Sequence, residues 1–241
     1  MSGHFQTKIR KSNTMINFEL TDDHKAIQQT VRDFASKEVA PRIKELDEKQ
    51  IFDASILDKM ADLNLLGVCI PEEYGGAGFD YISLGLVCEE LEAVDTFMRV
   101  IMSVHTGLNS LTLYTWGTEE QKRKYLVPQA KGERIATYGL TEPGAGSDVV
   151  GARSTARREG DEYVLNGEKM WISLADLADN FLFFCWTDHE VFWFYIFQIP
   201  ETLTGGMTLS SRVALAGSMF RYEYNLNVGR IKNWHSTLML E

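Results

Sequence analysis

The spacing of the apolar residues changes once along this chain of 241 residues, near Tyr138. From Phe18 to about Gly132 the apolar residues recur every three or four positions, which is typical of helices that bury one face. After Tyr138 they alternate with polar residues or form short aromatic runs, which is typical of strands. This order predicts an α+β chain in which an all-α domain is followed by an antiparallel β domain.

The same change sets the expected domain limits. We expect an N-terminal helical domain over residues 15–137 and a middle β domain over residues 138–241. Residues 1–14 are polar and mildly basic and lack the apolar core of a signal peptide, so we interpret them as a disordered leader.

Capping and turn residues predict where the helices and strands begin and end. In the second part, Asn166-Gly167 stands between two apolar runs and is typical of a two-residue hairpin turn. Aromatic runs predict further strands over residues 181–186 and 191–199. The signals in the first part are a cap at Thr21, an interruption at Pro41, a helix from Ser55 to Gly67, helices near residues 82–91 and 95–114, and a capping box at Thr118 and Gln121.

Composition excludes several classes of function. A net charge of −10 argues against a nucleic-acid surface, which needs clustered Lys and Arg. The sequence contains no long uncharged apolar run, so we expect no membrane-spanning helix. Cys69, Cys88 and Cys185 lie far apart and lack a metal-ligand spacing. We therefore expect reduced thiols, a cytoplasmic protein and no metal site.

The stretch Tyr138–Asp148, YGLTEPGAGSD, breaks from a short apolar strand into a loop of small residues. Such a loop leaves backbone amides open to a large polar ligand. A dinucleotide fingerprint needs a glycine where Val149 stands, and the Gly-Lys-Ser/Thr of a P-loop is missing. The residues alone leave two interpretations, a tight surface turn or a cofactor loop.

Four motifs in order, PEEYGGAG, WGTEEQKRKYL, YGLTEPGAGSD and LNGEKMWIS, resemble those of the flavin-dependent acyl-CoA dehydrogenases. The resemblance covers about residues 18–188. It implies a helical domain, a middle β domain and a C-terminal helical bundle. It also implies FAD as cofactor, an acyl-CoA thioester as substrate, an electron-transfer flavoprotein as electron acceptor and a homotetramer. In that chemistry a carboxylate removes the α proton and a hydride passes from the neighbouring carbon to flavin N5.

The resemblance also implies which residues contact the flavin. The strand and loop would meet its polar edge through backbone groups and the Thr141 hydroxyl, and Ser147 would touch both flavin and acyl-CoA. Trp171 would cover the isoalloxazine ring, although an ordinary core position is the alternative for this residue. The cofactor-binding residues implied are Tyr138, Leu140, Thr141, Gly146, Ser147, Trp171, Ile172 and Ser173.

Two further stretches, residues 95–110 and MWISLADLADNF, are most similar to dehydrogenases of alicyclic acyl-CoA thioesters, the cyclohexene-carboxyl-CoA type, and next to glutaryl-CoA dehydrogenases. In the glutaryl branch the residue that matches Arg99 faces the distal carboxylate of the substrate. A surface ion pair between Asp95 and Arg99 is an alternative. In a third interpretation Asp95 reaches the acyl pocket and acts as the base, with a pKa raised by burial.

The resemblance ends after Asp188, and residues 212–241 match the family poorly. The C-terminal bundle is missing from this sequence, and with it the catalytic glutamate that the family places there. Two explanations stay open, a fragment or disrupted gene product, and a complete shortened homologue. Two function classes stay open as well: an acyl-CoA dehydrogenase or its flavin half, with an acyl-CoA oxidase as a variant, and a non-catalytic acyl-CoA/flavin-binding or assembly protein.

Overall fold

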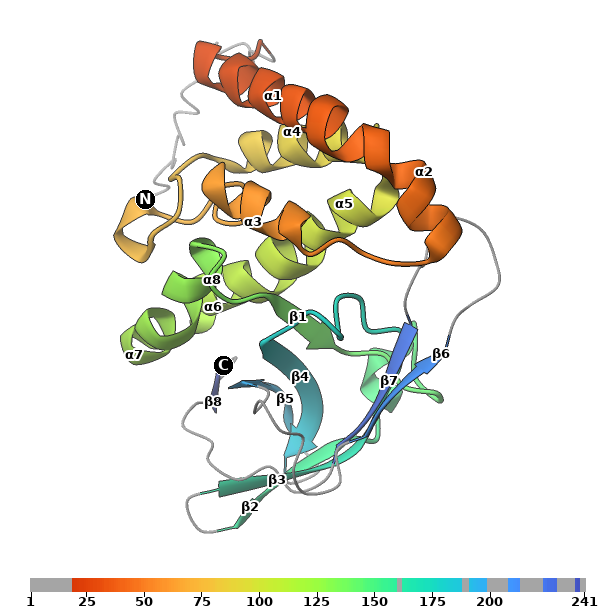
Figure 1. Cartoon of the computed structure of the whole chain (residues 1–241). Helices are drawn as coiled ribbons and strands as arrows, with labels where there is room; N and C mark the ends of the chain where they lie inside the picture. The colour runs from red at the N-terminus through yellow and green to blue at the C-terminus, as the bar shows by residue number, and fades with distance from the viewer. Residues whose placement is uncertain are drawn as a thin grey trace, which may run out of the picture.

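The computed structural model separates a helical part from a part made of strands (Figure 1). The helices lie together on one side, and strand β1 lies between them and the rest of the sheet. The expected leader, residues 1–14, and most of the chain after residue 198 lie outside the described residues. The structure describes residues 19–159, 162–187, 191–198, 208–212, 223–228 and 237–238.

The first helices form where the sequence supplies caps. Thr21 Oγ1 accepts a hydrogen bond from the His24 amide at 3.2 Å, and His24 Nδ1 accepts one from the Thr21 amide at 3.3 Å. These bonds satisfy amides at the start of helix α1, so the predicted cap is confirmed. The helical elements are α1 (Asp22–Phe34), η1 (Ala35–Val39), α2 (Ala40–Lys49), α3 (Ser55–Asp62), η2 (Glu72–Tyr74), α4 (Tyr81–Glu92), α5 (Thr96–Ile101), η3 (Met102–Ser110), α6 (Leu111–Trp116), α7 (Glu119–Gln121), η4 (Lys122–Leu126), α8 (Val127–Ala130) and η5 (Val149–Gly151).

Two of the expected helix limits differ from the structure. The chain stays helical through Pro41, because the π-helical turn η1 precedes it and Pro41 occupies the first turn of α2, where its missing N–H is not needed. Helix α3 ends at Asp62, well before Gly67, and Asn64 follows with a left-handed φ of 55°. Gly67 instead allows close packing, since a Cβ there would lie 2.4 Å from the Ala130 carbonyl oxygen.

The later helix signals are confirmed. Helices α5, η3 and α6 run without a break from Thr96 to Trp116, as the spacing predicted for residues 95–114. Thr118 accepts a hydrogen bond from the Gln121 amide at 3.3 Å, and the Gln121 side chain accepts one from the Thr118 amide at 2.8 Å. This reciprocal pair is the predicted capping box.

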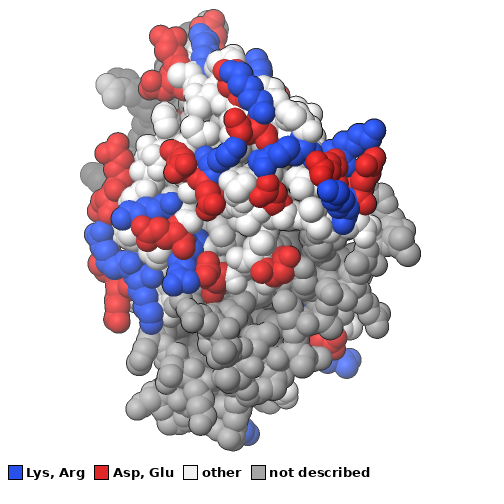
Figure 2. All heavy atoms as spheres, in the orientation of Figure 1, with Lys and Arg blue, Asp and Glu red and all other residues white. Residues whose placement is uncertain are grey.

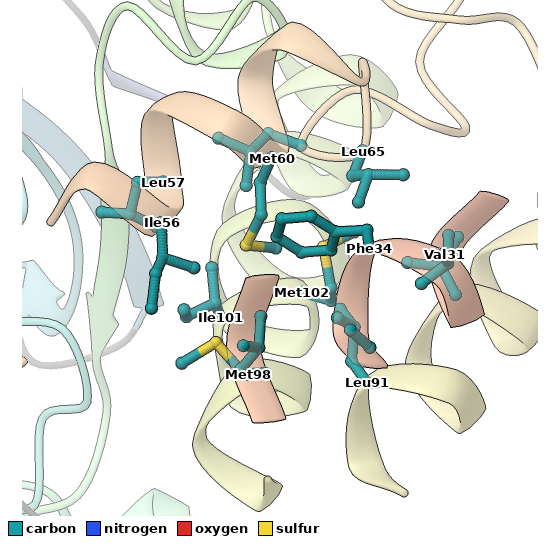
Figure 3. Packing of buried hydrophobic residues seen from close by; sticks show 14 of the residues in the cluster. Val31, Phe34, Ile56, Leu57, Met60, Leu65, Leu91, Met98, Ile101 and Met102 are labelled. Carbon is teal, nitrogen blue, oxygen red and sulfur yellow. The ribbon is translucent and has the colours of Figure 1, made fainter. Parts of the chain in front are cut away.

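The main hydrophobic core lies between the helices (Figure 3). Phe34 of α1 lies beside Met60 of α3 and Met102 of η3, and both methionines are fully buried. Leu174, which follows the LNGEKMWIS motif, belongs to the same core. The helical core therefore extends into the β part of the chain, as far as the segment between β3 and β4.

The strands form one sheet in the order β6-β7-β3-β2-β4-β5-β8, with β1 paired to β4. Most neighbouring strands are antiparallel, as predicted, but β1 pairs in parallel with β4, from Ala136↔Asn180 to Gly139↔Phe183. Strand β2 also pairs in parallel with β4, at Thr155↔Trp186. The strands are β1 (Ala136–Gly139), β2 (Thr155–Glu159), β3 (Glu162–Lys169), β4 (Asn180–Thr187), β5 (Val191–Gln198), β6 (Thr208–Arg212), β7 (Glu223–Val228) and β8 (Thr237–Leu238).

The hairpin predicted at Asn166-Gly167 is wrong. Both residues lie inside β3, which pairs antiparallel with β2 from Thr155↔Asn166 to Glu159↔Glu162. Gly167 is needed for a close approach instead, because a Cβ at this position would lie 2.1 Å from Ser154 Oγ.

Charges of both signs are interspersed over the helices on the face shown in Figure 2. Several form i,i+4 ion pairs, and those of Lys37 with Asp33 and of Arg123 with Glu119 join successive helical elements. Within the described ranges, no helix combines the length and apolar character needed to cross a membrane. The same part of the chain contains no group of three or more His, Cys, Asp or Glu side chains placed to hold a metal ion.

Candidate functional site

The loop at residues 141–148, here called the glycine-rich loop, begins two positions after the end of β1. Glu142 and Ala145 close it as a tight turn, with N–H···O distances of 2.9 and 3.1 Å between their backbones. Gly144, Gly146 and Ser147 are exposed, and a Cβ at either glycine would meet nothing within 4 Å. The loop is thus a tight turn and, at the same time, a surface open to a ligand.

The stretch of residues 170–174, here called the Trp segment, lies beside this loop. The Met170 amide donates to the Thr141 carbonyl at 2.9 Å, and Thr137 Oγ1 donates to the Ser173 carbonyl at 2.5 Å. The structure therefore places the backbone segments that contain Thr141 and Trp171 side by side, although 30 positions separate the two residues in the sequence.

Trp171 has two features that are unusual for its residue type. Its φ is 59°, in the left-handed region, and 53% of the residue is exposed. Leu174, at the other end of the segment, has a φ of 63°. Such conformations cost on the order of 1–3 kcal/mol each and concentrate at ligand sites. The ordinary core position considered for Trp171 does not agree with this exposure.

The other predicted flavin contacts surround the same place. Tyr138 is half-buried and packs edge-on against Phe184 with ring centroids 6.3 Å apart, and burial raises the pKa of its phenol. Leu140 is half-buried, Ile172 is buried beneath Gly139, and Ser173 is half-buried. Their contacts with a flavin remain a prediction.

A buried ion pair under the loop was not predicted from the sequence. Lys169 Nζ donates to Glu142 Oε1 at 2.7 Å and to the Leu140 carbonyl at 2.9 Å. Lys169 is 0% exposed and Glu142 7%. Burial opposes the charged carboxylate, but hydrogen bonds from Lys169 and from the Ser154 and Arg153 residues outweigh it, so the pKa of Glu142 lies below its ordinary value. Burial lowers the pKa of Lys169, and Glu142 opposes this effect.

A second buried group attaches the helices to β1. His105 Nδ1 accepts a hydrogen bond from the Ala136 amide at 3.0 Å, so its Nε2 carries the proton and donates to the Gln129 carbonyl at 3.1 Å. Asn109 Nδ2 donates to the Thr137 carbonyl at 2.6 Å. Complete burial lowers the pKa of His105 to about 4. Both residues come from η3, and side chains of this helix thus bind the backbone of β1.

Asp95, the predicted base, caps helix α5. Its carboxylate accepts a hydrogen bond from the Phe97 amide at 2.9 Å, and the residue is 9% exposed. It borders a surface cavity of about 540 Å³, whose lining includes Ile43 and Lys44 of α2. The cap gives Asp95 a structural role, and its role as a base remains a prediction.

Arg99, the predicted carboxylate reader, lies on the same helix. Its Nε donates to Glu92 Oε2 at 2.8 Å, and its Nη1 lies 3.4 Å from Ser103 Oγ. The structure thus shows Arg99 paired with Glu92, seven positions earlier, rather than with the residue four positions away that the spacing suggested. One third of the side chain is exposed, so a ligand can still reach it.

Two family models match the chain in sequence order. The model for the N-terminal domain of acyl-CoA dehydrogenases matches residues 21–133, and the model for their middle domain matches residues 137–220. The chain belongs to the acyl-CoA dehydrogenase family. The resemblance to this family that the four motifs indicated is therefore confirmed at the level of the family.

Individual acyl-CoA dehydrogenases agree with this assignment. A short-chain-specific acyl-CoA dehydrogenase of Clostridium acetobutylicum is 44% identical over 173 residues, 72% of this chain and 46% of the relative. The butyryl-CoA dehydrogenase of Megasphaera elsdenii has a TM-score of 0.83 at 31% identity, over 90% of this chain and 58% of that one. A glutaryl-CoA dehydrogenase of Mycobacterium smegmatis in complex with FADH2 has a TM-score of 0.80 at 32% identity, over 88% of this chain and 54% of that one. The chain spans about half the length of these relatives.

Proposed function

We propose that this chain forms the flavin-binding and acyl-CoA-binding part of an acyl-CoA dehydrogenase. The observation that carries the proposal concerns Trp171. Its side chain is exposed, its backbone φ is left-handed, and it lies directly beside the glycine-rich loop. A large aromatic surface of this kind gains free energy when a flat ring system covers it. A related glutaryl-CoA dehydrogenase has been solved in complex with FADH2, which supports FAD as the ligand.

The residues at this place fit a flavin. Glycines at positions 144 and 146 leave open space above the loop, and the side chains of Thr141 and Ser147 supply hydroxyl groups at its two ends. The residues that would hold the cofactor are Tyr138, Leu140, Thr141, Gly146, Ser147, Trp171, Ile172 and Ser173. Bound FAD would supply a two-electron acceptor for the oxidation of the thioester at Cα–Cβ. The contribution of these residues is to orient the ring and to exclude water from one face.

The acyl group stays a separate proposal. The relatives include short-chain and glutaryl enzymes, and Arg99 with Ser103 offers donors for a distal carboxylate if that ligand displaces Glu92. A dicarboxyl thioester should then bind more tightly than a plain one, and Arg99→Ala should abolish the difference. Arg123→Ala is the matched control, because Arg123 forms a similar helical ion pair with Glu119. Equal binding of both thioesters by the unmodified chain would favour an alicyclic acyl group.

The base and the partners are proposals as well. Asp95→Asn tests the base, because an amide cannot take the proton, and retained turnover would exclude Asp95. We propose an electron-transfer flavoprotein as partner. This proposal is supported by the similarity of this chain to one in the solved structure of the electron transferring flavoprotein of Acidaminococcus fermentans, with a TM-score of 0.83 at 34% identity. A homo-oligomer and a cytoplasmic location complete the proposal.

Titration of the purified chain with FAD tests the proposed function. We expect the flavin to stay with the protein on gel filtration, and its visible absorption band to bleach when an acyl-CoA is added. Binding of FAD without bleaching would favour the non-catalytic binding protein. Replacing Thr141 and Ser147 together by Ala should lower FAD retention. The control replaces Thr115 and Ser36, two helix-surface hydroxyls, by Ala. Unchanged retention in the first variant would contradict the site.

A further inference from the structure

One buried carboxylate connects both ends of the glycine-rich loop. Glu142 accepts hydrogen bonds from the Arg153 amide at 2.6 Å and the Ser154 amide at 2.9 Å, which follow the loop. On its other side it binds Lys169 Nζ at 2.7 Å, and this ammonium group also binds the Leu140 carbonyl, which precedes the loop. The ion pair therefore joins the residues before and after the loop to the end of β3.

The lysine is enclosed by the sheet. Its Nζ lies 5.2 Å from the centre of the Phe183 ring on β4. A Cβ at Gly139 would lie 3.3 Å from Lys169 Cγ, so the glycine gives the lysine stem room to cross β1. Buried ion pairs of this kind contribute little net stability, because desolvation of both charges offsets their attraction. The effect of the pair must therefore be sought in geometry rather than in the total free energy of unfolding.

The residue after Lys169 begins the Trp segment. Two consecutive residues therefore bind the loop: Lys169 through its side chain, to Glu142, and Met170 through its backbone amide, to the Thr141 carbonyl. A tryptophan keeps a left-handed φ only where its surroundings hold the backbone in place. The anchor at Lys169 lies two positions before this strained residue.

We propose that Glu142 and Lys169 are positioning residues, which hold the glycine-rich loop and the Trp segment against each other in the conformation that accepts the flavin. This inference rests on the proposed function for the identity of the ligand. The geometry of the loop itself can be measured without any ligand.

The test is the double variant Lys169→Met/Glu142→Gln in the full chain. Methionine keeps the unbranched shape of the lysine stem, and glutamine keeps an acceptor for the backbone amides, so neither charge is left buried alone. Lys169→Met alone is the second variant, which serves if the double variant does not fold, because the Arg153 and Ser154 amides still bind the Glu142 carboxylate. The matched control is Lys59→Met/Glu38→Gln, which removes a half-exposed ion pair between η1 and α3 by the same chemical change.

Two measurements decide the proposal. In hydrogen exchange without ligand, we expect the hydrogen-bonded amides of Glu142 and Ala145 in the loop, and of Met170 beside it, to exchange about tenfold faster in the double variant, while amides of the helical core keep their rates. We also expect a dissociation constant for FAD about tenfold higher than that of the unmodified chain, at a similar midpoint of thermal unfolding. The control variant should change neither the loop exchange nor the FAD affinity.

Three results would overturn the proposal. The first is loop exchange at the rate of the unmodified chain. The second is an equal acceleration of all amides, which would show that the pair acts on global stability alone. The third is faster loop exchange with unchanged FAD affinity. If the unmodified chain binds no FAD, the proposed function fails, and the exchange comparison alone then decides whether the pair positions the loop.

Discussion

Acidification should destabilise this protein through His105. The side chain is completely enclosed, its Nδ1 accepts the Ala136 amide, and burial lowers its pKa to about 4. In the unfolded chain the pKa of a histidine is about 6.5. Below that pH the histidine is protonated in the unfolded state but stays neutral in the folded state. The free energy of unfolding therefore falls as the pH decreases from about 6.5 to about 4.

The magnitude follows from the two pKa values. A full shift of this size corresponds to about 3 kcal/mol, and between pH 7 and pH 5 the expected loss in the free energy of unfolding is about 2 kcal/mol. Urea unfolding at these two pH values measures it directly. His105→Gln is the comparison variant, because an amide can accept from Ala136 and donate to Gln129 without titrating.

The variant should lose about 2 kcal/mol less than the unmodified chain over the same pH interval. Other ionisable groups contribute equally to both proteins and cancel in the difference. Equal pH dependence of the two proteins would refute the reasoning. It would show that the imidazole takes up its proton in the folded state without cost.

Three further substitutions test other features. Trp171→Gly removes the strain of the left-handed φ and should change the free energy of unfolding by no more than about 1 kcal/mol in either direction. The same substitution should weaken FAD binding at least tenfold. A large loss of stability in urea unfolding would show instead that the indole is a core residue. Gly67→Ala places a methyl group 2.4 Å from the Ala130 carbonyl oxygen and should lower the free energy of unfolding by about 1–3 kcal/mol. Gly85→Ala, with open space around it, serves as control, and similar stabilities of the two variants would contradict the close packing. Thr118→Ala removes the capping box and should lower the free energy of unfolding by about 1 kcal/mol, and an unchanged thermal midpoint would mean that the cap contributes nothing.

The sequence predicted best those features that depend on neighbours in the chain. Thr118 and Gln121 lie three positions apart, and their capping box follows from local geometry. Asn166-Gly167 also carries a local signal, but Ser154, which directly precedes β2, lies so close to Gly167 that a side chain there would clash. The local preference for a turn was therefore overridden by packing between strands.

The ion pair beneath the loop shows the other limit. Glu142 and Lys169 stand 27 positions apart, and each by itself is a residue type that normally faces solvent. A weak signal was present, since Glu142 stands three positions after the end of an apolar strand and Lys169 precedes Met-Trp-Ile. The pairings of β1 with β4, of β4 with β2 and of β2 with β3 bring the two charges together.

The attachment of β1 to helix η3 has a consequence for dissecting this protein. The backbone groups of Ala136 and Thr137 bond to the side chains of His105 and Asn109, which belong to the preceding helical domain of the family. An expression boundary between residues 133 and 137 would cut the chain where the two family domains adjoin, yet it would strip these partners from the strand. The isolated β fragment would then present an uncapped edge to other molecules and self-associate. The two halves should accordingly be produced together, or co-expressed as complementary pieces.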